Sequence, residues 1–107
     1  MSTSKLYKGS LDVIILKLLG EGPKMYGYKI AQCVKEITQG KLHITEGALY
    51  PALHKLRKKG FLKTSTEKVN GRTRKYYELT EKGEEEKMNK LEELEDFLGL
   101  LSALLSS

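Results

Sequence analysis

The stretch TEGALYPALHKLRKKG, residues 45–60, predicts one helix with two contrasting sides. Its apolar positions fall within an arc of about 100°, the stripe that a helix buries against a core, and they are Leu49, Ala52, Leu53 and Leu56. The opposite side starts small and ends cationic, with Gly47, Tyr50, Pro51, His54, Lys55 and Lys58. Tyrosine, histidine and lysine can donate to phosphate oxygens or base edges. An ordinary solvated helix face is the alternative, and the flanking segments favour the binding surface.

Local signals mark the ends of this helix. Thr45 is a suitable N-cap, Glu46 places negative charge in the first turn, and Gly60 suits the position just after the last turn. Pro51 lies about one and a half turns inside the helix, where a proline removes one backbone hydrogen bond and bends the axis. We interpret Pro51 as part of a recognition surface, and the alternative explanations are strain or a shifted helix start.

A β-hairpin is predicted directly after this helix. Residues 61–68 and 73–79 have strand character, and Asn70-Gly71 between them is the strongest short hairpin signal. The turn and its flanks carry four basic residues, Lys68, Arg72, Arg74 and Lys75. A basic hairpin that projects from a three-helix core describes a winged helix-turn-helix, a mainly α (α+β) fold.

Two further helices are predicted before residue 45. The first covers residues 7–19, with Ser10 as N-cap and apolar side chains in almost every direction, and residues 20–23 (GEGP) end it. A helix that is apolar all round must be covered on every side, so we predict that one side faces a second protomer. The second helix covers residues 26–38, with an inner stripe of Ile30, Cys33, Val34 and Ile37; Cys33 is interpreted as a small buried side chain rather than a reactive thiol.

The last helix is predicted over residues 81–105, with Thr80 as its N-cap. Leucines recur along it at alternating spacings of three and four, a heptad seam that needs a partner helix. We therefore divide the chain into a DNA-binding domain, residues 1–80, and a dimerisation helix, residues 81–107. The residues predicted for the dimer interface are Leu11, Ile15, Leu91, Leu94, Phe97, Leu98, Leu101 and Leu105.

The positive charge of the chain is concentrated in its middle. The 107 residues carry a net charge of +5, but residues 41–75 hold ten Lys or Arg against two Asp or Glu. Residues 76–107 hold three against nine. This asymmetry is typical of a surface that binds a polyanion. The single cysteine excludes an intrachain disulfide, and we find no signal peptide and no apolar run long enough to span a bilayer, so we expect a cytoplasmic protein without a membrane partner.

The sequence does not indicate an enzyme. His43 and His54 have no acidic partner at ligand spacing, and neither forms a metal pattern with Cys33. No phosphate-binding glycine loop and no nucleophilic serine motif occurs. We expect no catalytic residues, no metal and no cofactor.

Three blocks in order, LLGEGPKMYGYKI (18–30), ITEGALYPALHKLRKKGFL (44–62) and GRTRKYYELTEKG (71–83), resemble the PadR family of bacterial transcriptional regulators. Together they cover about two thirds of the chain, and the short final helix resembles the smaller PadR-like subgroup, which includes multidrug-responsive repressors. The resemblance implies a homodimeric winged-helix repressor that binds double-stranded DNA. In it, the first and last helices form the dimer, while the helix after Thr45 and the hairpin bind a pseudo-palindromic operator.

The resemblance also assigns positions. Tyr26 and Gly27 open the helix before the recognition helix, four positions match the family's G-x-L-Y-P region (Thr45, Gly47, Tyr50 and Pro51), and four match its wing (Gly71, Arg72, Lys75 and Tyr77). The full set of predicted DNA contacts is Tyr26, Thr45, Gly47, Tyr50, Pro51, His54, Lys55, Lys58, Arg72, Arg74 and Lys75.

The chain departs from the family in one respect. Some drug-sensing relatives hold flat aromatic ligands between tryptophans at the dimer interface, and this sequence has no tryptophan. Phe97 is the only aromatic residue in the final helix. A small-molecule effector at the dimer interface is therefore left open. The alternative function is a winged-helix protein-interaction module, in which the basic face meets an acidic protein instead of DNA.

Overall fold

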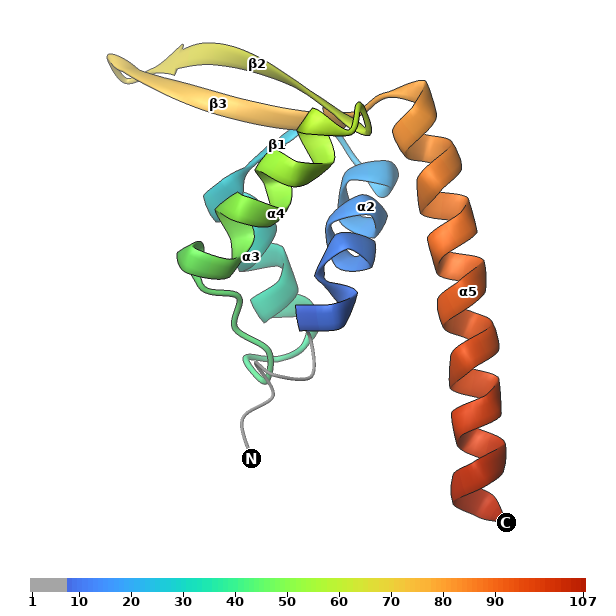
Figure 1. Ribbon diagram of the computed structural model, residues 1–107. Helices are drawn as coiled ribbons and strands as arrows, with labels where there is room; N and C mark the ends of the chain where they lie inside the picture. The colour runs from blue at the N-terminus through green and yellow to red at the C-terminus, as the bar shows by residue number, and fades with distance from the viewer. Residues whose placement is uncertain (1–7) are drawn as a thin grey trace.

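A small antiparallel sheet covers one end of three helices, and a long helix runs down one side (Figure 1). The computed structural model describes residues 8–107. Their elements are η1 (Lys8–Ser10), α2 (Leu11–Glu21), β1 (Met25–Tyr26), α3 (Gly27–Ile37), α4 (Glu46–Lys58), β2 (Leu62–Val69), β3 (Arg72–Leu79) and α5 (Glu81–Ser106). This arrangement is a winged helix, so the predicted fold class is confirmed.

The hairpin forms where the sequence predicted it. Strands β2 and β3 pair in register from Leu62 opposite Leu79 to Val69 opposite Arg72, which leaves two residues in the turn. Asn70 and Gly71 both have positive φ, 52° and 79°, as a type I′ turn requires. The hairpin is confirmed, and it projects beyond the helices (Figure 1).

A third strand was not predicted. Met25 and Tyr26 form β1, which pairs antiparallel with β3, so the sheet order is β1-β3-β2. Two residues are too few to show strand alternation in a sequence. This short strand connects the start of α3 to the base of the hairpin.

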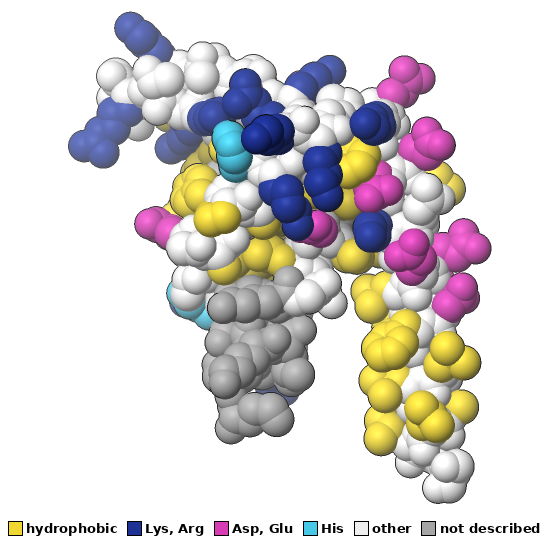
Figure 2. All heavy atoms as spheres, viewed as in Figure 1, with side chains coloured by type: hydrophobic (Ala, Val, Ile, Leu, Met, Phe, Trp, Pro, Cys, Tyr) yellow, Lys and Arg dark blue, Asp and Glu magenta, His cyan; other side chains and the backbone are white. Residues whose placement is uncertain are grey.

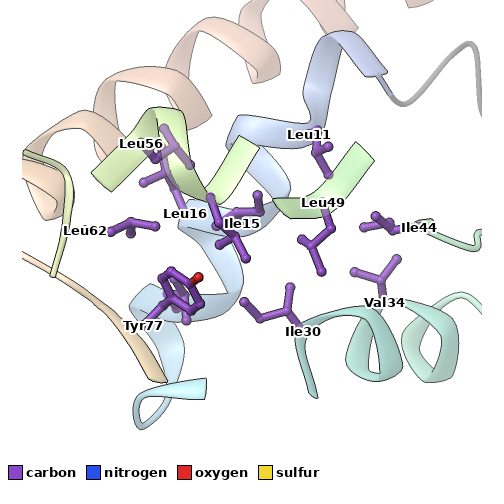
Figure 3. Close-up of a cluster of buried hydrophobic side chains, with 12 residues drawn as sticks. Leu11, Ile15, Leu16, Ile30, Val34, Ile44, Leu49, Leu56, Leu62 and Tyr77 are labelled. Atoms are coloured by element: carbon purple, nitrogen blue, oxygen red, sulfur yellow. The ribbon is translucent and has the colours of Figure 1, made fainter. Parts of the chain in front are cut away.

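The core lies between α2, α3, α4 and the sheet (Figure 3). Leu11 and Ile15, predicted for the dimer interface, are 5% and 0% exposed within this core, and they have no surface to offer a partner. Their burial gives that prediction no support, because the surrounding elements of the same protomer cover these positions of α2. The buried side chains are Leu11, Ile15, Leu16, Leu19, Ile30, Val34, Ile44, Leu49, Leu53, Leu56, Leu62 and Tyr77.

Details of the first two helices also differ from the predictions. Tyr7, the predicted first residue of the first helix, lies outside the described residues, and the Ser10 side chain makes no capping hydrogen bond. Helix α2 continues through Gly20 to Glu21, because the chain leaves the helix only at the extended Gly22. On α3, Ile37 is 71% exposed instead of buried, and Cys33 is only partly buried.

Helix α5 begins at Glu81 as predicted, and the Thr80 hydroxyl accepts a hydrogen bond from the Gly83 N–H as its N-cap. Its first half packs against α2, whereas its second half extends past the core (Figure 1). Leu91 and Leu94 are half-buried, and the leucines from residue 98 onward are exposed. Within the protomer, α5 therefore has a covered half and an uncovered half.

Candidate nucleic-acid interface

The first turn of α4 is fixed by its cap. The Thr45 hydroxyl accepts a hydrogen bond from the Ala48 N–H at 3.3 Å, which confirms Thr45 as the N-cap. Pro51 lies inside the helix, and the helix continues beyond it to Lys58. Leu49, Leu53 and Leu56 anchor the inner side in the core. The outer side of α4 is thus held on a firmly packed base.

The predicted outer side of α4 faces solvent. Tyr50 is 44% exposed, and its hydroxyl lies 2.6 Å from the position that a Cβ would take on Gly27. A larger residue at the start of α3 would therefore displace the tyrosine ring. The exposed residues of this side are Gly47, Tyr50, Pro51, His54, Lys55 and Lys58.

Lys55 is not a free cation. Its ammonium group lies 2.9 Å from the Asp12 carboxylate at the start of α2. The pair is largely exposed, so it adds little stability, but it draws Lys55 toward α2 and offsets part of its charge. Lys55 and Asp12 lie far apart in sequence, so no local pattern indicated the pair.

Two predicted residues from distant segments meet on the outer face of the sheet. The Arg74 guanidinium carbon lies 4.0 Å from the centre of the Tyr26 ring, in cation–π contact. Tyr76 meets Tyr26 edge-on, with 5.7 Å between ring centres. Arg74 is therefore partly occupied in holding the hairpin to β1, while Arg72 and Lys75 nearby are exposed.

Tyr28 belongs to this aromatic cluster and was missed from the sequence. Its ring stacks on Tyr26 with 6.4 Å between centres, and it is 66% exposed in the first turn of α3. The spacing Tyr-Gly-Tyr before a helix was the available signal. An exposed tyrosine there can reach a phosphate beside the helix N-terminus.

A second tie joins the hairpin to the segment before β1. Lys24 forms an ion pair with Glu67 of β2, and this hydrogen bond raises the pKa of Lys24 above its usual value. On the inner face of the sheet, burial raises the pKa of the Tyr77 hydroxyl above its usual value. Although the resemblance placed Tyr77 in the wing, its ring belongs to the core.

The charges separate over the surface. Figure 2 shows Lys and Arg side chains gathered over the hairpin and α4, whereas Asp and Glu lie mainly along α5. Four exposed cations that were not among the predicted DNA contacts belong to α4, its C-terminal end or the hairpin: Arg57, Lys59, Lys63 and Lys68. Such a one-sided distribution attracts a polyanion to the α4–hairpin face and repels it from α5.

The part of the chain that the structure describes shows neither a candidate metal site nor a candidate membrane-spanning helix. Residues 8–107 contain no group of three or more His, Cys, Asp or Glu placed to hold a metal ion. Across the same residues, no helix combines the length and the hydrophobicity needed to cross a membrane.

A capped helix on a hydrophobic core, followed by a hairpin that carries exposed cations, is typical of the class of winged-helix proteins. The family model described as the transcriptional regulator PadR-like family matches residues 15–89, most of the chain. The chain belongs to this family and is a PadR-type transcriptional regulator.

Solved structures and a curated relative resemble the chain over most of its length. A transcriptional regulator from Clostridium thermocellum has a TM-score of 0.85 and 32% identity, covering 92% of this chain and 96% of that one. A PadR family transcription regulator from Clostridium difficile has a TM-score of 0.74 and 28% identity, covering 89% and 97%. An uncharacterized protein of Lysinibacillus sphaericus is 37% identical over 84 residues, 78% of this chain and 76% of its own length.

Proposed function

We propose that this protein is a cytoplasmic homodimer that binds a pseudo-palindromic operator in double-stranded DNA and represses transcription. The observation that carries the proposal is the exposed, cationic face formed by α4 and the hairpin (Figure 2). The acidic residues lie mainly along α5, away from this face. A helix with its side chains is roughly 10–12 Å across, which matches the roughly 12 Å width of the major groove. Helix α4 is therefore the recognition helix, and the hairpin is the wing.

Within this proposal, the exposed residues of α4 divide the work by chemistry. Tyr50, His54 and Lys58 face away from the core and contact phosphates and base edges, while Thr45 places the N-terminus of α4 beside a phosphate. Arg72 and Lys75 reach the DNA backbone or minor groove from the wing. Tyr26 and Arg74 support this wing through their mutual contact.

The exposed half of α5 supports the dimer. Phe97, Leu98, Leu101 and Leu105 are among its uncovered apolar residues, and Leu105 is 79% exposed. A heptad-spaced leucine seam is complementary to a second copy of itself, and burying it removes a large apolar patch from water. We propose that α5 pairs with α5 of a second protomer, with Leu91 and Leu94 at the inner end of the seam.

A two-fold dimer presents two α4 helices to one side of the DNA. Such dimers bind half-sites about one helical turn apart, roughly 34–36 Å. Repression then results from blocking RNA polymerase at the promoter. A small-molecule effector at the α5 interface would act by changing the separation of the two α4 helices.

The test begins with selection of bound duplexes from a random DNA pool by the full-length protein. Fluorescence anisotropy then measures the affinity of the selected duplex for the wild type, for Tyr50→Ala and for the control Met88→Ala, which alters an exposed residue of α5. We expect Tyr50→Ala to weaken binding by about tenfold or more, the value of one good contact, and Met88→Ala to leave it unchanged. Failure to enrich any sequence would overturn the proposal and favour the protein-interaction module; enrichment with full affinity for Tyr50→Ala would remove Tyr50 from the interface.

A further inference from the structure

The C-terminal end of α4 lies against the first turn of α5. The chain leaves α4 through Gly60, whose φ of +85° favours glycine, and the Phe61 N–H donates to the Leu56 carbonyl at 3.0 Å. The Gly60 N–H donates to the Arg57 carbonyl at 2.9 Å, which completes a Schellman motif. This motif aims the carbonyl groups of residues 59–61 toward α5.

Thr80 binds both helix ends at once. Its hydroxyl donates to the Gly60 carbonyl at 2.6 Å and accepts from the Gly83 N–H at 3.0 Å. Its backbone N–H donates to the Phe61 carbonyl at 3.1 Å. The residue that caps α5 therefore also fixes the segment that ends α4.

Lys82 adds a second tie from α5. Its ammonium group donates to the Lys59 carbonyl at 3.0 Å and lies 5.2 Å from the centre of the Phe61 ring. The Lys59 carbonyl belongs to the C-cap of α4, where a cation also complements the helix dipole.

Gly83 brings the two backbones into direct contact. It is the one buried residue of α5, and a Cβ there would overlap the Phe61 carbonyl oxygen and lie 2.9 Å from the carbonyl carbon. Backbone atoms cannot rotate away as a side chain can. At Gly20, which also faces α5, the nearest atoms belong to the flexible Lys87 side chain, so that contact can adjust.

We call residues 59–61 together with residues 80–83 the α4–α5 joint. We propose that Thr80, Lys82 and Gly83 are positioning residues, which fix the angle between α4 and α5 and thereby the separation of the two recognition helices in the dimer. The inference rests on the proposed dimer through α5. It assigns to these three residues the selection of half-site spacing, although none of them is among the proposed DNA contacts.

The length of α5 makes the dimer sensitive to this angle. Helix α5 has 26 residues, which corresponds to about 39 Å at the rise of an α-helix. A tilt of about 10° at the joint therefore moves the far end by about 7 Å, or about two base pairs of DNA. Because the far end of α5 carries the exposed seam, such a tilt would shift the partner's α4 by a similar distance.

The test measures the distance between the two α4 helices in the free protein. His54→Cys in a Cys33→Ser background places one spin label on the exposed side of each α4, and double electron–electron resonance gives the distance between protomers. Gly83→Ala is compared with Gly99→Ala, because a Cβ at Gly99 meets nothing within 4 Å. Lys82→Met keeps the length of the side chain and removes its charge.

We expect Gly83→Ala to shift the mean distance by several ångströms, Lys82→Met to broaden the distribution, and Gly99→Ala to match the parent protein. A dimeric Gly83→Ala with the parent distance and width would overturn the inference. Should Gly83→Ala fail to fold, an unchanged distribution for Lys82→Met overturns it equally. A parent protein that is monomeric by light scattering and shows no spin pair would instead overturn the dimer of the proposed function, and this inference with it.

The consequence for DNA is tested by selection. A duplex library in which two copies of the selected half-site are separated by spacers of different lengths is offered to the same variants. We expect Gly83→Ala to change the preferred spacer by one or two base pairs and Gly99→Ala to keep it. If the Gly83→Ala dimer has a shifted inter-helix distance but keeps the parent spacer length, the α4–α5 joint does not determine half-site spacing, and that part of the inference is overturned.

Discussion

Helices α4 and α5 carry similar leucine patterns but differ in exposure. In α4, Leu49, Leu53 and Leu56 are at most 2% exposed, whereas Leu98, Leu101 and Leu105 of α5 are 37% to 79% exposed. The spacing of apolar residues by three and four therefore predicts one apolar side of a helix, but it does not say what covers that side. A neighbouring element of the same chain covers α4, and the second half of α5 has no such neighbour among the described residues.

The difference follows from the arrangement of the elements. Helix α4 contacts α2, α3 and β2, so its leucines enter a core that is closed on several sides. Helix α5 packs mainly on α2 and β3, and only its first turn meets the segment that ends α4. Because α5 is more than twice as long as α2, only its first half can be covered in this way.

The largest effect is expected from breaking the anchor of α4. Leu53→Ala removes a side chain that is fully buried, and we expect a loss of about 2–5 kcal/mol in the free energy of unfolding. Urea denaturation measures this loss, with the neighbouring exposed His54→Ala as the control. Equal stabilities for the two variants would show that α4 is not held by its leucine side.

A second variant acts on the uncovered half of α5. Leu98→Asp places a charge in the proposed seam, and we expect the dimer to weaken by about 100-fold or more, since an unpaired charge resists burial. The fold of each protomer should persist by circular dichroism. Ala103→Asp adds the same charge on the opposite side of α5 and should leave the dimer intact; light scattering over a dilution series compares the two, and equal dissociation would place the interface elsewhere.

The two threonine caps sharpen the comparison between α4 and α5. Thr45→Ala removes one capping hydrogen bond, at a cost of about 1 kcal/mol. Thr80→Ala also loses the bond to the Gly60 carbonyl, so we expect about 2 kcal/mol. Urea denaturation resolves the difference, and Thr80→Ser should restore stability. A smaller loss for Thr80→Ala than for Thr45→Ala would contradict the double role of Thr80.

The smallest effect concerns the charges of the wing. Arg72→Ala should lower the slope of log affinity against log salt concentration by about one, because Arg72 is an exposed cation at the turn. Arg74→Ala should lower it less, because Arg74 is stacked on Tyr26. Anisotropy titrations of the selected duplex at several salt concentrations give both slopes. Equal reductions would mean that Arg74 leaves Tyr26 and contacts phosphate when DNA binds.

Much of the fold could be predicted because its signals are local. A side-chain N-cap needs a hydroxyl that accepts a hydrogen bond from a backbone N–H no more than three residues away. Thr45 and Thr80 were therefore identifiable from sequence alone. The Asn70-Gly71 turn needs only two residues that tolerate positive φ. The family resemblance likewise came from contiguous blocks, and the family match confirms it.

The candidate site could be predicted only in part, because several contacts join residues far apart in sequence. The exposed side of α4 followed from helical periodicity, which is a local property. The ion pair of Lys55 with Asp12 and the stacking of Arg74 on Tyr26 depend on how the helices and the sheet pack. Neither pair leaves a mark in spacing or composition.

The sequence by itself determined the helices, the hairpin, the threonine caps at Thr45 and Thr80 and the concentration of positive charge, because each depends on neighbouring residues or on simple composition. Tertiary structure alone decided which apolar residues are covered: it buried Ile15 within the protomer and left Ile37 in water. It also brought Gly83 against Phe61. A side chain is buried only when another segment lies over it, and the position of that segment depends on the packing of the whole chain.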